Sequence, residues 1–157
     1  MNILNAATGE ELIPLVKPPI TQEQLQRYAE ASGDHNPIHL NEEAARRVGL
    51  DSVIAQGMLS MAFLGQFINQ RIPDVSGVYL THLKVRFISM VRLGDSITCH
   101  GTVKARTTGD GEQEYVTVEC WAQNQEGEKV TIGDAVVSIP LQLKKEVKET
   151  ICPLKCP

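Results

Sequence analysis

A carboxylate and an imidazole stand five residues apart in this chain, at Asp34 and His39, with Asn36-Pro37 between them. Proline cannot continue a helix, because its ring clashes with the preceding turn and it has no N–H to donate. The two side chains therefore flank a bend, where they can converge on one small object such as a water molecule. A carboxylate accepts hydrogen bonds and an imidazole can donate or accept, so the pair could fix and activate that water.

Taken alone, this spacing favours a structural interpretation. An aspartate before Asn-Pro is more often an Asx-turn residue, and a lone histidine is more often a satisfied structural or surface group. The other histidines carry no predicted role. His35 is expected to be exposed, while His82 and His100 fall on the polar sides of expected strands.

Short capped helices are predicted on both sides of the bend. Thr21 can cap a helix over residues 22–31, and Gly33 would end it. Asn41 can cap a second helix, with acidic residues in its first turn, basic residues in its last turn and Gly49 just beyond. The bend would then be held between two helix ends.

The most apolar stretch of the chain predicts a central helix over residues 57–71. Its apolar side chains point in nearly every direction around the helix axis, and a helix of that kind is buried. Two small residues, Ser60 and Gly65, interrupt the pattern and could let strands approach closely. The apolar residues are Met58, Leu59, Met61, Ala62, Phe63, Leu64, Phe67 and Ile68.

The second half of the chain predicts four strands, because apolar and polar residues alternate there. The expected strands cover residues 78–88, 96–106, 113–123 and 130–139. The last changes phase near Gly133-Asp134, which indicates a bulge. The apolar face of the first strand would consist of Tyr79, Leu83, Val85 and Phe87. An antiparallel sheet curved around one apolar helix is an α+β architecture, and a homodimer would cover its open edges.

The bend and its surroundings resemble the signature of the MaoC-like, or hydratase 2, family. The matching residues at the bend are Tyr28, Ser32, Gly33, Asp34, Asn36, Pro37, Ile38 and His39. The match continues through Ala45, Gly49-Leu50, Ile54-Ala55-Gln56-Gly57-Met58-Leu59, Val85-x-Phe87 and Val91-x-x-Gly94-Asp95. Several separated motifs in the right order are specific for the family, although not for one substrate. The resemblance implies one hot-dog domain over residues 1–140 and a homodimer. The residues after it, 141–157, are expected to form a charged tail.

The resemblance also implies a hydro-lyase. It would hydrate trans-2-enoyl thioesters with (R) specificity and catalyse the reverse dehydration of (R)-3-hydroxyacyl thioesters. Asp34 and His39 would activate the water, and Asn36 would orient them. Negative charge builds on the thioester oxygen as the enolate forms, so a hydrogen-bond donor is needed there as well. The backbone N–H of Gly57, at the positive end of the central helix, can be this donor, although a plain helix-start glycine is the structural alternative.

Four further residues are weaker candidates for binding the substrate. Gln56 stands where many relatives have histidine; it can still form hydrogen bonds but cannot titrate. Met58 could shape the acyl pocket, although it is a core residue by default. Lys84 and Arg86 share the polar face of one strand, where they could meet phosphates of CoA or of a carrier protein, or form a solvated face.

Composition excludes several classes of function. The chain has 157 residues, a net charge of −4 and only 4% aromatic residues, with no basic block that would indicate nucleic-acid binding. No apolar run is long enough to span a membrane, and the first residues do not resemble a secretory signal, so we expect a cytoplasmic protein. Cys99 and Cys120 fit core strands, while Cys152 and Cys156 stand in the tail without a nearby histidine, so no metal is expected. No cofactor is expected beyond the CoA or acyl carrier of the substrate.

Three alternatives stay open. The chain could be the catalytic subunit of a heterodimeric 3-hydroxyacyl-carrier-protein dehydratase. A hot-dog thioesterase often has a carboxylate on or beside its central helix, but residues 58–70 contain no Asp, Glu or His. A non-enzymatic acyl-thioester-binding protein is the third possibility. The acyl length and the choice between CoA and a carrier protein lie beyond the sequence.

Overall fold

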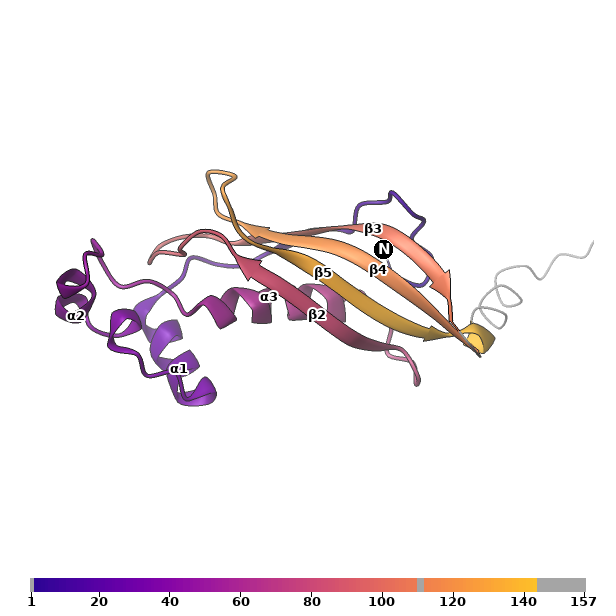
Figure 1. Ribbon diagram of the computed structural model, residues 1–157, viewed down its shortest axis with the longest axis horizontal. Helices are drawn as coiled ribbons and strands as arrows, with labels where there is room; N and C mark the ends of the chain where they lie inside the picture. The colour runs from indigo at the N-terminus through magenta and orange to yellow at the C-terminus, as the bar shows by residue number, and fades with distance from the viewer. Residues whose placement is uncertain (1, 110–111, 144–157) are drawn as a thin grey trace, which may run out of the picture.

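A computed structural model describes residues 2–109 and 112–143 of the chain (Figure 1). The elements in order are β1 (Leu15–Val16), α1 (Gln22–Ser32), the 3-10 turn η1 (Pro37–His39), α2 (Glu42–Arg47), α3 (Gly57–Asn69), β2 (Tyr79–Phe87), β3 (Thr98–Thr108), β4 (Gln113–Gln123) and β5 (Lys129–Pro140). The strands pair antiparallel in the order β1-β3-β4-β5-β2. Of the predicted tail, residues 144–157 lie outside the described residues, Cys152 and Cys156 among them.

The sheet curves over α3, and the two share the hydrophobic core (Figure 1). Phe67 on the buried side of α3 meets the inner face of β3 at Gly101, where an added Cβ would lie 2.8 Å from the phenyl ring. The alternation predicted for 113–123 is confirmed, because Val116, Val118, Cys120 and Ala122 are all fully buried. This α+β hot-dog arrangement agrees with the prediction.

The predicted N-terminal caps are present in the helices on both sides of the bend. The Thr21 hydroxyl accepts a hydrogen bond from the backbone N–H of Gln24, and Asn41 Oδ1 accepts one from Ala44. Gly33 ends α1 with φ +77°, a left-handed conformation that glycine adopts without strain. The helices α1 and α2 lie together at the N-terminal end of α3, beyond the end of the sheet (Figure 1).

Several expectations about the strands and the central helix are wrong. Tyr79 is 63% exposed, because a register shift between Leu80 and His82 changes which side of β2 faces the core. The bulge in β5 does not lie near Gly133-Asp134: pairing with β4 is continuous there, and the register shifts at Val130 instead. The central helix is shorter than predicted, and one of its faces is open in the single chain, with Met58 52% exposed.

No helix within the described ranges is both long enough and apolar enough to cross a membrane.

Candidate active site

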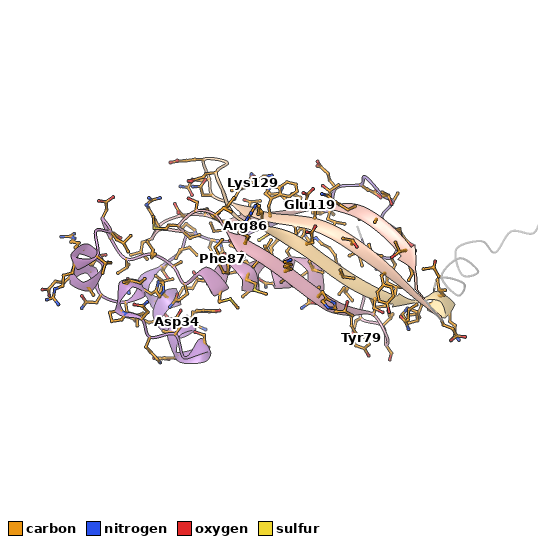
Figure 2. All side chains as sticks on the ribbon, in the orientation of Figure 1. Asp34, Tyr79, Arg86, Phe87, Glu119 and Lys129 are labelled. Atoms are coloured by element: carbon orange, nitrogen blue, oxygen red, sulfur yellow. The ribbon has the colours of Figure 1, made fainter. Side chains whose placement is uncertain are left out.

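The bend brings the two predicted side chains together. His39 Nε2 lies 3.8 Å from Asp34 Oδ2, which is too long for a direct hydrogen bond and close enough for both atoms to contact one water molecule. The side chain of His39 is 9% exposed and that of Asp34 is 43% exposed. The pair therefore has one buried member and one that solvent reaches, as a site that takes up water requires. Figure 2 shows Asp34 in the part of the molecule formed by α1 and α2.

A backbone carbonyl fixes the orientation of the imidazole. His39 Nδ1 lies 2.7 Å from the carbonyl oxygen of Ile54, which can only accept a hydrogen bond, so Nδ1 carries the proton and donates it. In the neutral ring, Nε2 is then an acceptor directed toward Asp34. The arrangement can hold a water that donates one hydrogen to the imidazole and the other to the carboxylate.

The Asp34 carboxylate also belongs to the turn. Its Oδ1 accepts a hydrogen bond from the backbone N–H of Asn36, which is an Asx turn, while Oδ2 faces His39. The backbone N–H of Asp34 donates to the hydroxyl of Ser32, which in turn donates to the carbonyl of Tyr28. The structural and the functional interpretations of Asp34 therefore coexist.

Two other members of the signature lie close to the carboxylate. Asn36 is exposed, and its Oδ1 accepts the backbone N–H of Ile38, so its side chain orders the first turn of η1. Burial, and secondly the charge of Asp34, raise the pKa of the Tyr28 hydroxyl. Tyr28 thus stays protonated at neutral pH beside the bend.

Gly57 begins α3, where the first backbone N–H groups of a helix have no partner within the helix. The ring of Phe87, at the end of β2, packs against it: a Cβ added at Gly57 would lie 3.4 Å from two ring carbons. Glycine thus leaves room between the backbone and this ring. Ile54, which holds His39, stands only three residues before Gly57.

Gln56 precedes Gly57 and is 1% exposed. Its side-chain Nε2 donates to the carbonyl of Leu25 in α1, at 3.2 Å, and its Oε1 is buried without a partner among the described residues. The residue therefore ties α1, which leads into the Asp34 turn, to the start of α3.

The remaining candidates divide between this site and the outer face of the sheet. Met58 lies in the first turn of α3 beside Gly57 and is exposed. Lys84 and Arg86 are exposed on β2, on the opposite side of the sheet from the core. His35 and His82 are exposed, as predicted.

Neither a metal site nor a reactive thiol is found in the described part of the chain. It contains no group of three or more His, Cys, Asp or Glu side chains that could hold a metal ion. Cys99 and Cys120 are core residues, as predicted, and burial raises the pKa of each thiol to about 12. Both are therefore protonated at neutral pH and inert as nucleophiles.

Sequence reasoning assigned no role to Ile54 or Phe87. Ile54 acts through its backbone, so its side chain gives no signal. Phe87 was expected in the core, yet it is 45% exposed and covers Gly57. Both residues stand inside motifs quoted for the family resemblance, and that is the one signal that could have found them.

The chain is similar to known acyl-thioester hydratases and dehydratases. The family model described as a MaoC-like domain matches residues 4–125. An (R)-specific enoyl-CoA hydratase from Rhodospirillum rubrum is 31% identical over 121 residues, covering 77% of this chain and 81% of its own. A mitochondrial 3-hydroxyacyl-[acyl-carrier-protein] dehydratase from Arabidopsis thaliana is 29% identical, covering 76% and 70%. The solved (R)-hydratase from A. caviae, involved in PHA biosynthesis, has a TM-score of 0.74 and 25% identity, covering 87% of this chain and 98% of its own.

Proposed function

The chain belongs to the MaoC-like family, and from this premise we propose that it is a hydro-lyase acting on acyl thioesters. It hydrates trans-2-enoyl thioesters to (R)-3-hydroxyacyl thioesters and, by mass action, dehydrates the products. The observation that carries the proposal is the contact of Asp34 and His39, one exposed and one buried, at the bend predicted to hold water.

In the proposed mechanism, water lies between Asp34 Oδ2 and His39 Nε2. One O–H bond of the water breaks as its oxygen bonds to C3, and the pair takes up the proton. The electron pair of the C2–C3 double bond moves toward the thioester, and C2 then receives a proton from the pair. The products balance, because one water adds across one double bond.

The Gly57 N–H would stabilise the charge that develops on the thioester oxygen. A backbone donor at a helix start is already oriented and adds the positive end of the helix dipole. Ile54 and Gln56 hold this helix start against the bend, so both halves of the site have a fixed relation. The chemistry as proposed uses no metal and no redox cofactor.

The first test measures the hydration of crotonyl-CoA by the unaltered protein and by Asp34→Asn. The reaction is monitored as the loss of absorbance of the conjugated thioester. We expect Asp34→Asn to lower kcat by about 10²–10⁴-fold, the contribution typical of a general acid or base. Asp51→Asn, which changes an exposed carboxylate near α2, is the matched control and should keep full activity. A folded Asp34→Asn variant with normal turnover would contradict the mechanism.

The group that carries the acyl chain of the substrate, and the oligomeric state of the protein, are also proposals. The two curated relatives are named for CoA and for carrier-protein substrates, and we favour CoA for the reason argued below. We expect a homodimer, and the heterodimeric dehydratase is its alternative.

A further inference from the structure

We propose that a groove on the outer face of the sheet binds the phosphates of coenzyme A when the substrate is an acyl-CoA. This inference rests on the proposed function and extends it, because the groove lies on the side of the sheet away from α3. The groove has a volume of about 430 Å³ and is lined by residues of β2, β4 and β5.

The first row of groove residues crosses the three strands in register. In the backbone register of the sheet, Lys84 of β2 stands opposite Asp134 of β5, and Asp134 stands opposite Glu119 of β4. Glu119 is already engaged, because the ammonium of Lys104 lies 3.0 Å from its carboxylate. Among the described residues neither Lys84 nor Asp134 takes part in an ion pair, so this row presents one free cation and one free carboxylate.

The second row adds two cations and an indole. Arg86 is in register with Ile132, and Ile132 with Trp121. The ammonium of Lys129 lies 4.5 Å from the centre of the Trp121 ring, a cation–π contact that holds it over the groove. Within the ranges that the structure describes, Arg86 and Lys129 have no carboxylate within 4.0 Å. With Lys84, the groove carries three cations against one free carboxylate. Figure 2 shows Arg86, Lys129 and Glu119 near one another, toward the end of the sheet where Phe87 is labelled.

This set of side chains suits the nucleotide end of CoA. Arginine binds phosphate through two parallel N–H groups and lysine acts as a compact charge, and three such groups match a ligand with several phosphates. The Trp121 indole already contacts the Lys129 ammonium and is stacked with the ring of His100, so we assign the groove to the phosphates alone. CoA carries three phosphates, whereas a carrier protein presents its pantetheine arm on a single phosphodiester. The chemistry of the groove therefore favours CoA.

The groove is close to the thioester site through the end of β2. Phe87 packs against Gly57, while Arg86, the preceding residue, lines the groove, because successive side chains of a strand point to opposite faces. Ile88, which follows β2, also lines the groove. The flexible pantetheine arm would pass around this strand end, from the thioester at Gly57 to the phosphates on the outer face.

The test compares crotonyl-CoA with crotonyl-pantetheine, which lacks the nucleotide. We expect the double variant Lys84→Gln/Arg86→Gln to raise KM for crotonyl-CoA by about tenfold, the loss expected for two ion pairs on the protein surface. KM for crotonyl-pantetheine should not change. The matched control is Arg46→Gln/Arg47→Gln, which removes two charges from side chains that are 71% and 72% exposed on α2. It should leave both KM values unaltered.

Two outcomes would overturn the inference. Equal increases of KM for both substrates would mean that Lys84 and Arg86 act at the thioester site, and no increase for either would mean that the groove takes no part. Calorimetric titration with CoA separates this inference from the proposed function, because binding needs no turnover. If CoA bound the unaltered protein and bound the double variant tenfold or more weakly, while neither hydrated crotonyl-CoA, the proposed function alone would fail.

Discussion

The two oxygens of Asp34 have separate partners, and this division decides what the residue can do. Oδ1 accepts the Asn36 N–H and keeps the turn closed, while Oδ2 faces the imidazole of His39. Because the turn uses one oxygen only, a water at Oδ2 does not compete with the fold. An asparagine at position 34 would keep the turn through its own carbonyl oxygen and lose only the negative charge. That is why Asp34→Asn tests chemistry rather than stability.

Gln56 is the side chain whose removal should loosen the site without touching the reacting atoms. Its amide joins α1 to the start of α3, so it acts as a positioning residue for Asp34 and Gly57. We expect Gln56→Leu, which keeps a similar volume, to lower kcat about tenfold, the rate equivalent of about 1.4 kcal/mol. KM should change less, because the groups that contact the substrate remain present.

A histidine at this position is the informative control for that prediction. Its ring can still donate a hydrogen bond to the Leu25 carbonyl, so Gln56→His should recover most of the lost rate. Initial rates with crotonyl-CoA and the melting temperature of each variant would be measured together. Gln56→Leu with the kcat of the unaltered protein would show that α1 and α3 keep their relation without this bond.

The helix α3 and the strand β3 approach so closely that one residue between them must lack a side chain. A Cβ at Gly101 would lie 2.8 Å from Phe67 and 3.0 Å from Val118, closer than carbon atoms pack. We expect Gly101→Ala to lower the free energy of unfolding by about 1–3 kcal/mol, the usual cost of overpacking. Urea denaturation followed by circular dichroism would measure it.

Gly65, on α3, provides the matched control for the same substitution. Its added Cβ would lie 3.8 Å from Leu83, an ordinary contact, and alanine is favoured over glycine within a helix by about 0.5–1 kcal/mol. Gly65→Ala should therefore be neutral or stabilising. Equal destabilisation by both substitutions would mean that the helix and sheet are held by something other than this close contact.

Within single elements, helix starts set by local side-chain chemistry could be predicted from the sequence. The core-facing side of a strand, which depends on its pairing with another strand, could not. Thr21 and Asn41 cap their helices through their own side chains, so the helix starts were predictable. The side of β2 that faces the core depends on a register shift against β5, and the sequence of β2 alone indicated the wrong side for Tyr79. The contact of His39 with the Ile54 carbonyl gives no side-chain signal, because any residue at position 54 provides that oxygen.

One face of α3 is uncovered in the single chain, and this is the main departure from a helix predicted to be buried all round. Its exposed residues recur at helical spacing: Met58, Ala62, Gln66 and Asn69. The strand β2 is at the same time an edge of the sheet, with unpaired backbone groups along one side. A second copy that pairs along β2 would extend the sheet and could cover the open face of α3, which is why we expect a homodimer.

Ala62 lies in the middle of this open face, so a charge there should prevent the association. We expect the unaltered chain to have twice the 17.3 kDa mass of one copy by light scattering, and Ala62→Glu to have the mass of one. A carboxylate buried without a partner costs about 3–5 kcal/mol, and a symmetric dimer would bury two of them. Ala31→Glu, at an exposed alanine of α1, is the matched control and should remain dimeric. An unaltered chain of single mass that doubles only when a different chain is added would instead identify the open face as the binding surface of a heterodimer.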